Sequence, residues 1–257
     1  MKIVLLGSGN VATHLGKALH LSGNQIIQVW SRNQLHAQEL AEQIDAEPLS
    51  GTDQINSFAD LYIVSVTDNS ITDTIALIPG EHQLIAHTAG SVDMKILSAR
   101  SNNIGVIYPV QTFTKQKEID FRQIPIAIEG SDFEVTEKLI ALAESISDQV
   151  FQLNSASRMA LHISAVLACN FSNHLYALAE SLLQQQGVDF SIIYPLIAET
   201  AEKALKISPR QAQTGPAVRG DSTTIDKHIE FLKTNPELQE LYVKLSQSIM
   251  RLNLGLQ

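Results

Sequence analysis

Cysteine is almost absent from this sequence, with Cys169 the single cysteine among 257 residues. One cysteine cannot build an internal disulfide framework, so a reducing, cytoplasmic location is expected. No stretch of 18 apolar residues lacks polar interruption, and no membrane-spanning helix is therefore predicted. A strand pattern follows Met1 directly, which predicts no signal or transit peptide.

Positive charge is also scarce. The chain has 18 Lys and Arg residues against 27 Asp and Glu residues, a formal net charge of −9, and it contains no dense basic run. Nucleic acids and anionic membranes are therefore poor candidate partners. The length permits a large core and either one large domain or two.

The sequence does contain a glycine-rich turn between a strand pattern and a helix pattern. Residues 2–6 form an apolar run typical of a strand buried on both faces of a parallel sheet. The next residues, 7–12, read Gly-Ser-Gly-Asn-Val-Ala and match G-x-G-x-x-G/A. In that pattern the first glycine permits a tight turn and the second lets a pyrophosphate approach free N–H groups at a helix start. Dinucleotide binding is therefore predicted at Gly7, Ser8, Gly9, Asn10 and Val11.

The end of the second predicted strand, residues 25–30, bears on the choice of dinucleotide. An NAD enzyme usually places Asp or Glu about 20 residues beyond the glycines, on the ribose 2′-hydroxyl. This chain has Ser31 and Arg32 there, a hydroxyl and a guanidinium that suit a 2′-phosphate. Alternatively, Ser31 or Asn33 caps the next helix and Arg32 is a solvated surface residue. NADP is favoured over NAD as the cofactor.

The remainder of the first half alternates between strand and helix patterns. Expected strands cover 61–66, 84–86, 104–108, 124–128 and 150–153, and expected helices include 34–44 and 134–146. The strand at 124–128 contains Pro125 and is placed at a sheet edge. Thr67 and Asp68 follow a buried strand and are candidate cofactor contacts, although Asp68 would also suit a helix N-cap.

Two further polar side chains are expected at the same sheet edge. His87 follows the strand at 84–86 and could exchange a proton with a substrate, or it could be structural and bonded to backbone in a turn. Gln111 follows the strand at 104–108 and would point towards substrate if that strand is parallel to its neighbours.

The second half shows helical patterns only, so two domains are expected at 1–153 and 154–257. Residues 157–186 read as one unbroken helix that ends before Gly187. Its small and apolar residues surround most of its circumference, which predicts burial on all sides and a homodimer that covers one face. The fold class is thus an α/β Rossmann domain followed by an all-α dimerisation and substrate domain.

Polar residues on this long helix recur at multiples of four: His162, Asn170 and His174. His162 and His174 would be ~18 Å apart along the helix, so no metal site is expected. One histidine could meet substrate while Asn170 holds a carbonyl or hydroxyl. Equally, all three could be hydrogen-bonded core or interface residues.

A glycine- and proline-containing loop at 214–221 holds Arg219 and Asp221. Arg219 could clamp an anionic substrate or cofactor, or it could pair locally with Asp221. Residues 223–226 resemble a capping box at the start of a helix that carries His228. Asn235 is expected to cap the last helix.

Five motifs occur in order along the chain and carry a family resemblance. They are residues 7–12, residues 87–91 (His-Thr-Ala-Gly-Ser), residues 108–113 (Tyr-Pro-Val-Gln-Thr-Phe), Asn170-Phe171 and residues 215–221 (Gly-Pro-Ala-Val-Arg-Gly-Asp). Together they resemble the bacterial Rossmann-like proteins with a C-terminal helical domain of unknown function, described as NADP oxidoreductases. Wider relatives are pyrroline-5-carboxylate reductase, deazaflavin-dependent NADP reductases, and the 6-phosphogluconate and 3-hydroxyacid dehydrogenases. The resemblance implies a site between the domains and a dimer formed by the helical domain.

One departure from the wider relatives affects the chemistry. The 3-hydroxyacid dehydrogenases have a catalytic Lys three or four residues before an Asn on the long helix. Leu167 and Val166 occupy those positions before Asn170, so that proton chemistry does not carry over.

The expected function is hydride transfer between NADP and a small carbonyl, imine or hydroxyl compound in the cleft between the predicted domains. The nicotinamide cofactor carries the hydride, and the protein must orient the substrate and supply one proton. Candidate catalytic or positioning residues are His87, His162, Asn170, His174, Arg219 and His228, with Gln111. The alternative is a non-catalytic NADP(H)-binding sensor or regulatory dimer.

Overall fold

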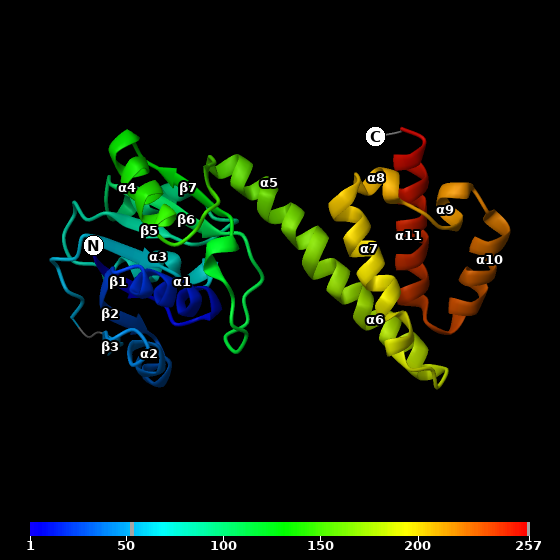
Figure 1. Ribbon diagram of the computed structural model, residues 1–257, viewed down its shortest axis with the longest axis horizontal. Helices are drawn as coiled ribbons and strands as arrows, with labels where there is room; N and C mark the ends of the chain where they lie inside the picture. The colour runs from blue at the N-terminus through cyan, green and yellow to red at the C-terminus, as the bar shows by residue number, and fades with distance from the viewer. Residues whose placement is uncertain (52–53, 256–257) are drawn as a thin grey trace. The chain divides into compact units, whose positions relative to one another are not determined.

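The computed structural model describes residues 1–51 and 54–255. The described residues divide into two compact units, one on each side of the Asn170–Phe171 bond (Figure 1). In the first unit, helices surround a sheet; in the second, the described elements are helical. The expected class, an α/β Rossmann region followed by a helical region, is confirmed.

The sheet of unit 1 has eight strands in the order β3-β2-β1-β4-β5-β6-β7-β8. Neighbouring strands are parallel except for β6 and β7. Their bounds are β1 Lys2–Leu6, β2 Gln25–Ser31, β3 Glu47–Ser50, β4 Leu61–Val64, β5 Ile85–His87, β6 Ile104–Pro109, β7 Ile126–Gly130 and β8 Val150–Gln152. Because β1 to β6 are parallel along the sheet, their carboxyl ends meet at one edge, where ligands of such folds bind.

The prediction that the proline-containing strand lies at an edge is wrong. Strand β7 lies between β6 and β8, and Pro125 stands just before it, outside the ladder. Pro125 needs no N–H there, and its carbonyl accepts a 2.8 Å hydrogen bond from the Val110 N–H. A true edge strand is β3, which contains Pro48 and had not been expected as a strand.

Helices pack on both faces of the sheet in unit 1. Their bounds are α1 Asn10–Leu21, α2 Gln34–Ala41, α3 Ile71–Ile75, α4 Phe133–Glu144 and α5 Ser155–Ala165, with short 3-10 turns η1 Asp68–Ser70, η2 Met94–Ala99 and η3 Phe121–Gln123. Successive side chains of a strand point to opposite faces. Ile3 and Leu5 accordingly join one hydrophobic cluster, and Val4 and Leu6 join the other. The buried strand pattern thus produces two cores on one sheet.

The long helix is helical throughout its expected length but is not uniform. A π-helical segment, η4 Val166–Phe171, separates α5 from α6 Ser172–Gln185, and Gly187 ends the helix with a φ of 67°. The expected burial on all sides is not met within one chain, because Ile163, Leu167 and Phe171 are 51%, 56% and 54% exposed. The two units divide inside this segment, later than the predicted boundary, and the limits 1–153 and 154–257 stay a prediction.

Unit 2 consists of α6, α7 Tyr194–Lys206, α8 Pro209–Ala212, α9 Pro216–Arg219, α10 Ser222–Phe231 and α11 Pro236–Asn253, with the short turns η5 Phe190–Ile193 and η6 Leu232–Thr234. Asn235 caps α11 as expected, accepting from the Leu238 N–H at 3.2 Å. The cap of α10 is Asp221 rather than Thr223, because its carboxylate accepts from the Thr224 N–H at 3.0 Å. Among the described residues, no helix has the length and apolar character needed to cross a bilayer.

Candidate cofactor-binding and reaction site

The glycine loop between β1 and α1 has a backbone conformation that requires glycine at its first position, Gly7. Gly7 has a φ of 131°, and a Cβ atom there would lie 2.1 Å from the Ser65 carbonyl oxygen. Gly9 stands at the N-cap of α1 in an extended conformation, and a Cβ atom there would meet nothing within 4 Å. No side chain caps α1, so its first N–H groups are available to an anion.

A cavity of about 540 Å³ runs along the carboxyl edge of the sheet in unit 1. All nine residues predicted to bind cofactor line it: Gly7, Ser8, Gly9, Asn10, Val11, Ser31, Arg32, Thr67 and Asp68. Further lining residues come from the ends of β5 and β6 and from α5, namely Gly90, Tyr108, Gln111 and His162. The structure therefore brings the predicted cofactor residues together on one wall.

The end of β2 forms a polar corner of this cavity. Ser31 is buried, and its hydroxyl oxygen accepts from the Ser8 hydroxyl at 2.8 Å and from the Asn33 N–H at 3.3 Å. Asn33 is the cap of α2, accepting from the N–H groups of Leu35 and His36 at 3.0 and 3.4 Å. Ser31 is therefore free of the capping role, and the exposed Arg32 stands beside it at the cavity.

Two other predicted cofactor residues are already engaged with the protein. The Asn10 side-chain amide donates to the Phe113 carbonyl at 2.9 Å, which leaves its backbone N–H as the group that faces an anion. Asp68 is not a helix cap. Its carboxylate accepts a hydrogen bond from the Ser91 hydroxyl and so joins the loops that follow β4 and β5.

His87 lies behind the cavity rather than on its wall. It is fully buried, and its Nδ1 accepts from the Ala89 N–H at 3.2 Å, whereas Nε2 has no partner among the described residues. Burial, reinforced by the positive charge of Arg158, lowers the pKa of His87 to about 4. A neutral, enclosed imidazole bonded to backbone favours the structural alternative considered for this residue.

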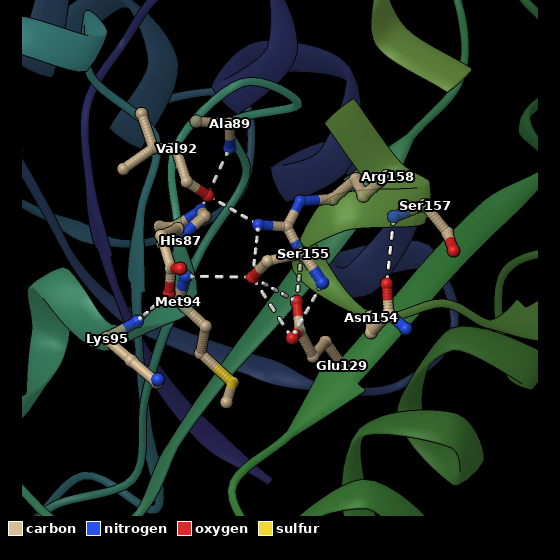
Figure 2. Close-up of polar contacts among 11 residues, drawn as sticks. His87, Ala89, Val92, Met94, Lys95, Glu129, Asn154, Ser155, Ser157 and Arg158 are labelled. Carbon is tan, nitrogen blue, oxygen red and sulfur yellow. Dashed lines mark hydrogen bonds and ion pairs between the residues drawn. The ribbon is translucent and has the colours of Figure 1, made fainter. Parts of the chain in front are cut away.

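A buried ion pair that was not predicted from the sequence lies next to His87 (Figure 2). Arg158 of α5 is 1% exposed; its guanidinium binds the Glu129 carboxylate of β7 and the Val92 carbonyl, and donates to the Ser155 hydroxyl at 3.2 Å. The Ser155 N–H also donates to Glu129, at 2.9 Å. These bonds hold the first turn of α5 against the sheet. No local sequence pattern signals a pair that is 29 residues apart.

A tyrosine–histidine pair lies on the cavity wall one turn further along α5. The Tyr108 hydroxyl, at the end of β6, is 3.1 Å from His162 Nδ1, and the two rings meet edge to face. Burial raises the pKa of Tyr108. A Cβ atom on Gly90 would lie 2.6 Å from His162 Nδ1 and 2.8 Å from Tyr108 Cζ. His162 was predicted from the sequence as one of several candidate histidines, whereas no role was predicted for Tyr108.

The remaining predicted catalytic residues are exposed. Asn170 ends unit 1 in the π-helical segment; His174 lies on α6, and Arg219 ends α9. His228 of α10 is 2.7 Å from the Tyr242 hydroxyl. None of these four lines the cavity of unit 1, and their roles stay predictions. Gln111 does line it, with its side-chain oxygen accepting from the Thr112 N–H at 2.8 Å.

Comparison with known proteins is consistent with this geometry. Residues 2–90 match the family model described as NADP oxidoreductase, coenzyme F420-dependent, and residues 124–249 match a domain of unknown function, DUF2520. A search of curated proteins found no match. Among solved structures, a Bacteroides fragilis protein assigned as an NADP oxidoreductase is 42% identical, with a TM-score of 0.88 over 97% of this chain and 98% of that one.

More distant structures share the fold alone. A Thermotoga maritima protein is 21% identical, with a TM-score of 0.76 over 98% of both chains. Pyrroline-5-carboxylate reductase of Streptococcus pyogenes is 18% identical, with a TM-score of 0.58 over 97% of this chain and 98% of that one.

The fold and the glycine-loop cavity define a Rossmann-type oxidoreductase with a helical C-terminal region. Within that class, the chain belongs to the family of NADP oxidoreductases that includes the Bacteroides fragilis protein. The family resemblance expected from the sequence motifs is thereby confirmed.

Proposed function

We propose that the chain binds NADP(H) along the cavity of unit 1 and transfers hydride between the nicotinamide and a small carbonyl, imine or hydroxyl compound. One observation carries this proposal: a single cavity extends from Ser31 and Arg32, past the glycine loop, to Tyr108 and His162. It therefore has phosphate-binding groups at one end and groups that can exchange a proton at the other.

The corner at Ser31 suits a 2′-phosphate. Because the Ser31 oxygen already accepts two hydrogen bonds, its own O–H is free to donate to a phosphate oxygen. Arg32 would add a permanent positive charge and forked N–H donors. The pyrophosphate would lie at the uncapped start of α1, over the open space beside Gly9.

The substrate class follows from what the other end of the cavity offers. NADP(H), when bound, supplies the hydride, so the protein needs only to orient a polarised double bond and to move one proton. A reductive aminase of Aspergillus terreus, whose structure contains NADPH4, cyclohexanone and allyl amine, shares this fold at 19% identity and a TM-score of 0.67. Small ketones and imines are therefore the first substrates to examine.

The exposed polar residues predicted from the sequence are proposed as substrate contacts rather than proton donors. Asn170 and Arg219 would hold a carbonyl oxygen or an anionic group, and His174 and His228 would be secondary candidates. His87 is proposed as a structural residue of the loop after β5, because it is buried, neutral and off the cavity wall.

A homodimer and a cytoplasmic location belong to the same proposal. Ile163, Leu167 and Phe171 expose large apolar side chains on one stretch of helix, a pattern typical of a surface that another subunit covers. Light scattering of the purified chain should give twice the monomer mass, and Leu167→Glu should reduce it. Cys169 is free and exposed, which suits a reducing compartment.

Parallel calorimetric titrations with NADPH and NADH test the function. Tight NADPH binding with much weaker NADH binding is expected, followed by NADPH oxidation in the presence of ketones or imines. Binding of neither nucleotide would refute the proposal. Binding without turnover of any small carbonyl or imine would favour the sensor instead.

A further inference from the structure

We propose that Tyr108 is the proton donor of the reaction and that His162 recharges it. This inference rests on the proposed function and adds a chemical assignment to it. The two side chains meet at 3.1 Å, Tyr108 Oη to His162 Nδ1, and both line the cavity. A tyrosine hydroxyl and an imidazole in direct contact can pass a proton from one to the other.

The strand order places this pair at the end of the cavity that would hold the nicotinamide. Ser31 ends β2 and Arg32 follows it, the glycine loop follows β1, and Tyr108 stands at the end of β6. From β2 to β6 the order β2-β1-β4-β5-β6 makes four steps, or ~19 Å at about 4.8 Å between strands. A dinucleotide with its adenosine end at β2 and its pyrophosphate at β1 extends its other half towards β5 and β6.

Gly90 shows that the loop after β5 is shaped around this pair. Any side chain at position 90 would collide with both rings, since a Cβ atom would lie 2.6 Å from His162 Nδ1 and 2.8 Å from Tyr108 Cζ. The φ of Gly90 is not in the left-handed region, so backbone strain does not explain the glycine. Its missing side chain provides the room in which Tyr108 and His162 meet.

The proton transfers balance for a carbonyl substrate. As the carbonyl carbon accepts hydride, the two electrons of the transferred C–H bond form the new bond, and the π pair moves to oxygen. That oxygen takes the Tyr108 hydroxyl proton, and the phenolate oxygen takes a proton from protonated His162 Nδ1. Neutral His162 then takes a proton from water. A neutral imine nitrogen would take the same proton, and alcohol oxidation reverses each step.

Burial favours the protonated phenol that this scheme requires. It raises the pKa of Tyr108, so the hydroxyl keeps its proton at neutral pH until the substrate oxygen becomes basic. The buried Arg158–Glu129 pair fixes the other partner. Arg158 and His162 are four residues apart on α5 and share a face, so the anchored first turn sets the position of the imidazole.

An NMR comparison of two cofactor complexes tests the assignment without any substrate. Enzyme labelled with ¹³C at histidine Cε1 is examined in the presence of NADP⁺ and of NADPH, with the His162 signal assigned from His162→Asn. The oxidised nicotinamide carries a positive charge, which should displace the Cε1 signal of a nearby His162 between the two complexes. His82, exposed before the amino end of β5, is the internal control and should give the same signal in both complexes.

The outcomes separate the two proposals. If neither nucleotide binds, the proposed function fails. If both bind and the His162 signal is the same in both complexes, the pair does not lie at the nicotinamide, and the proton-donor assignment is overturned while cofactor binding stands.

Steady-state kinetics with NADPH and two probes, cyclohexanone and 4-nitrobenzaldehyde, provide the second arm. Tyr108→Phe should lower kcat/KM by about 10²- to 10⁴-fold with unchanged NADPH affinity. His162→Asn, which keeps a donor or acceptor near the Nδ1 position, should lower kcat less and should abolish the decline in rate that follows loss of the imidazole proton. Tyr62→Phe is the matched control, since Tyr62 is a strand tyrosine whose hydroxyl bonds the Asn56 carbonyl away from the cavity. A Tyr108→Phe enzyme as fast as the parent would overturn the assignment.

Discussion

The Ser8 hydroxyl donates a 2.8 Å hydrogen bond to the Ser31 hydroxyl and so joins the glycine loop to the end of β2. Ser31 in turn accepts from the Asn33 N–H at the start of α2. The two proposed phosphate subsites, one at α1 and one at β2, are therefore parts of one hydrogen-bonded unit. A change in the Ser8–Ser31 contact should therefore alter cofactor affinity through both subsites.

Arg32→Gln should weaken NADPH binding and leave NADH binding unchanged. Arg32 is exposed and lies at the cavity, so its replacement removes charge without disturbing the core. Loss of one charge-assisted contact of about 1.5 kcal/mol corresponds to roughly tenfold weaker NADPH binding. Calorimetry should show NADH affinity unchanged, and Arg251→Gln on α11 serves as the matched control. Equal losses for both nucleotides would place the 2′-phosphate elsewhere.

Gly7→Ala should lower stability, whereas Gly9→Ala should lower cofactor affinity and leave stability unchanged. At Gly7 a methyl group would meet the Ser65 carbonyl at 2.1 Å with a φ of 131°, so about 3 kcal/mol of stability should be lost. At Gly9 the methyl group meets no protein atom, so the melting temperature should hold while NADPH affinity falls. Differential scanning fluorimetry and calorimetry measure the two effects. A Gly9→Ala protein with normal NADPH affinity would contradict the proposed path of the pyrophosphate.

Local patterns were sufficient to predict the glycine loop and the corner at Ser31 and Arg32. Those features depend on residues within one β-α-β unit, where strand period, turn chemistry and helix start all lie within a short stretch. The position of His87 could not be read in the same way. It ends a strand at the ligand edge as expected, yet its ring turns into the interior, bonds the Ala89 N–H and faces Arg158 from α5.

Long-range pairings escaped the sequence analysis for a related reason. The Arg158–Glu129 and Tyr108–His162 contacts join residues 29 and 54 apart, and each requires knowing how α5 packs on the sheet. The antiparallel insertion of β7 was equally hidden, because Pro125 looked like an edge signal although it stands just outside the strand. Such features depend on tertiary packing, which outweighs local propensity.

The buried ion pair that anchors α5 should show strong coupling in a double-mutant cycle. Arg158→Met leaves the Glu129 carboxylate, 15% exposed, without its guanidinium and should cost about 3–5 kcal/mol in unfolding free energy. Adding Glu129→Gln removes the unpaired charge and should recover part of that loss. Urea unfolding of the four proteins measures the coupling. Additive losses would mean that the two side chains do not act as a pair.

His87 should make the protein less stable in mild acid. Its pKa is about 4 in the folded protein against the ordinary histidine value of 6.5, because burial and the Arg158 charge oppose protonation more than Asp68 and Asp93 favour it. Between these two values the unfolded chain binds the proton and the folded chain does not, so stability falls as the pH falls through this window. The loss from pH 7 to pH 5 should be roughly 2 kcal/mol.

His87→Asn isolates this contribution because asparagine does not titrate and its side-chain oxygen can accept from the Ala89 N–H in place of Nδ1. Urea unfolding of parent and variant at pH 7 and pH 5 should show the parent losing more stability on acidification. His20→Asn, at the last turn of α1, is the matched control for exchanging a histidine for asparagine. If the His87→Asn protein loses as much stability as the parent between these pH values, the imidazole accepts a proton in the folded state, and its enclosed, neutral role is wrong.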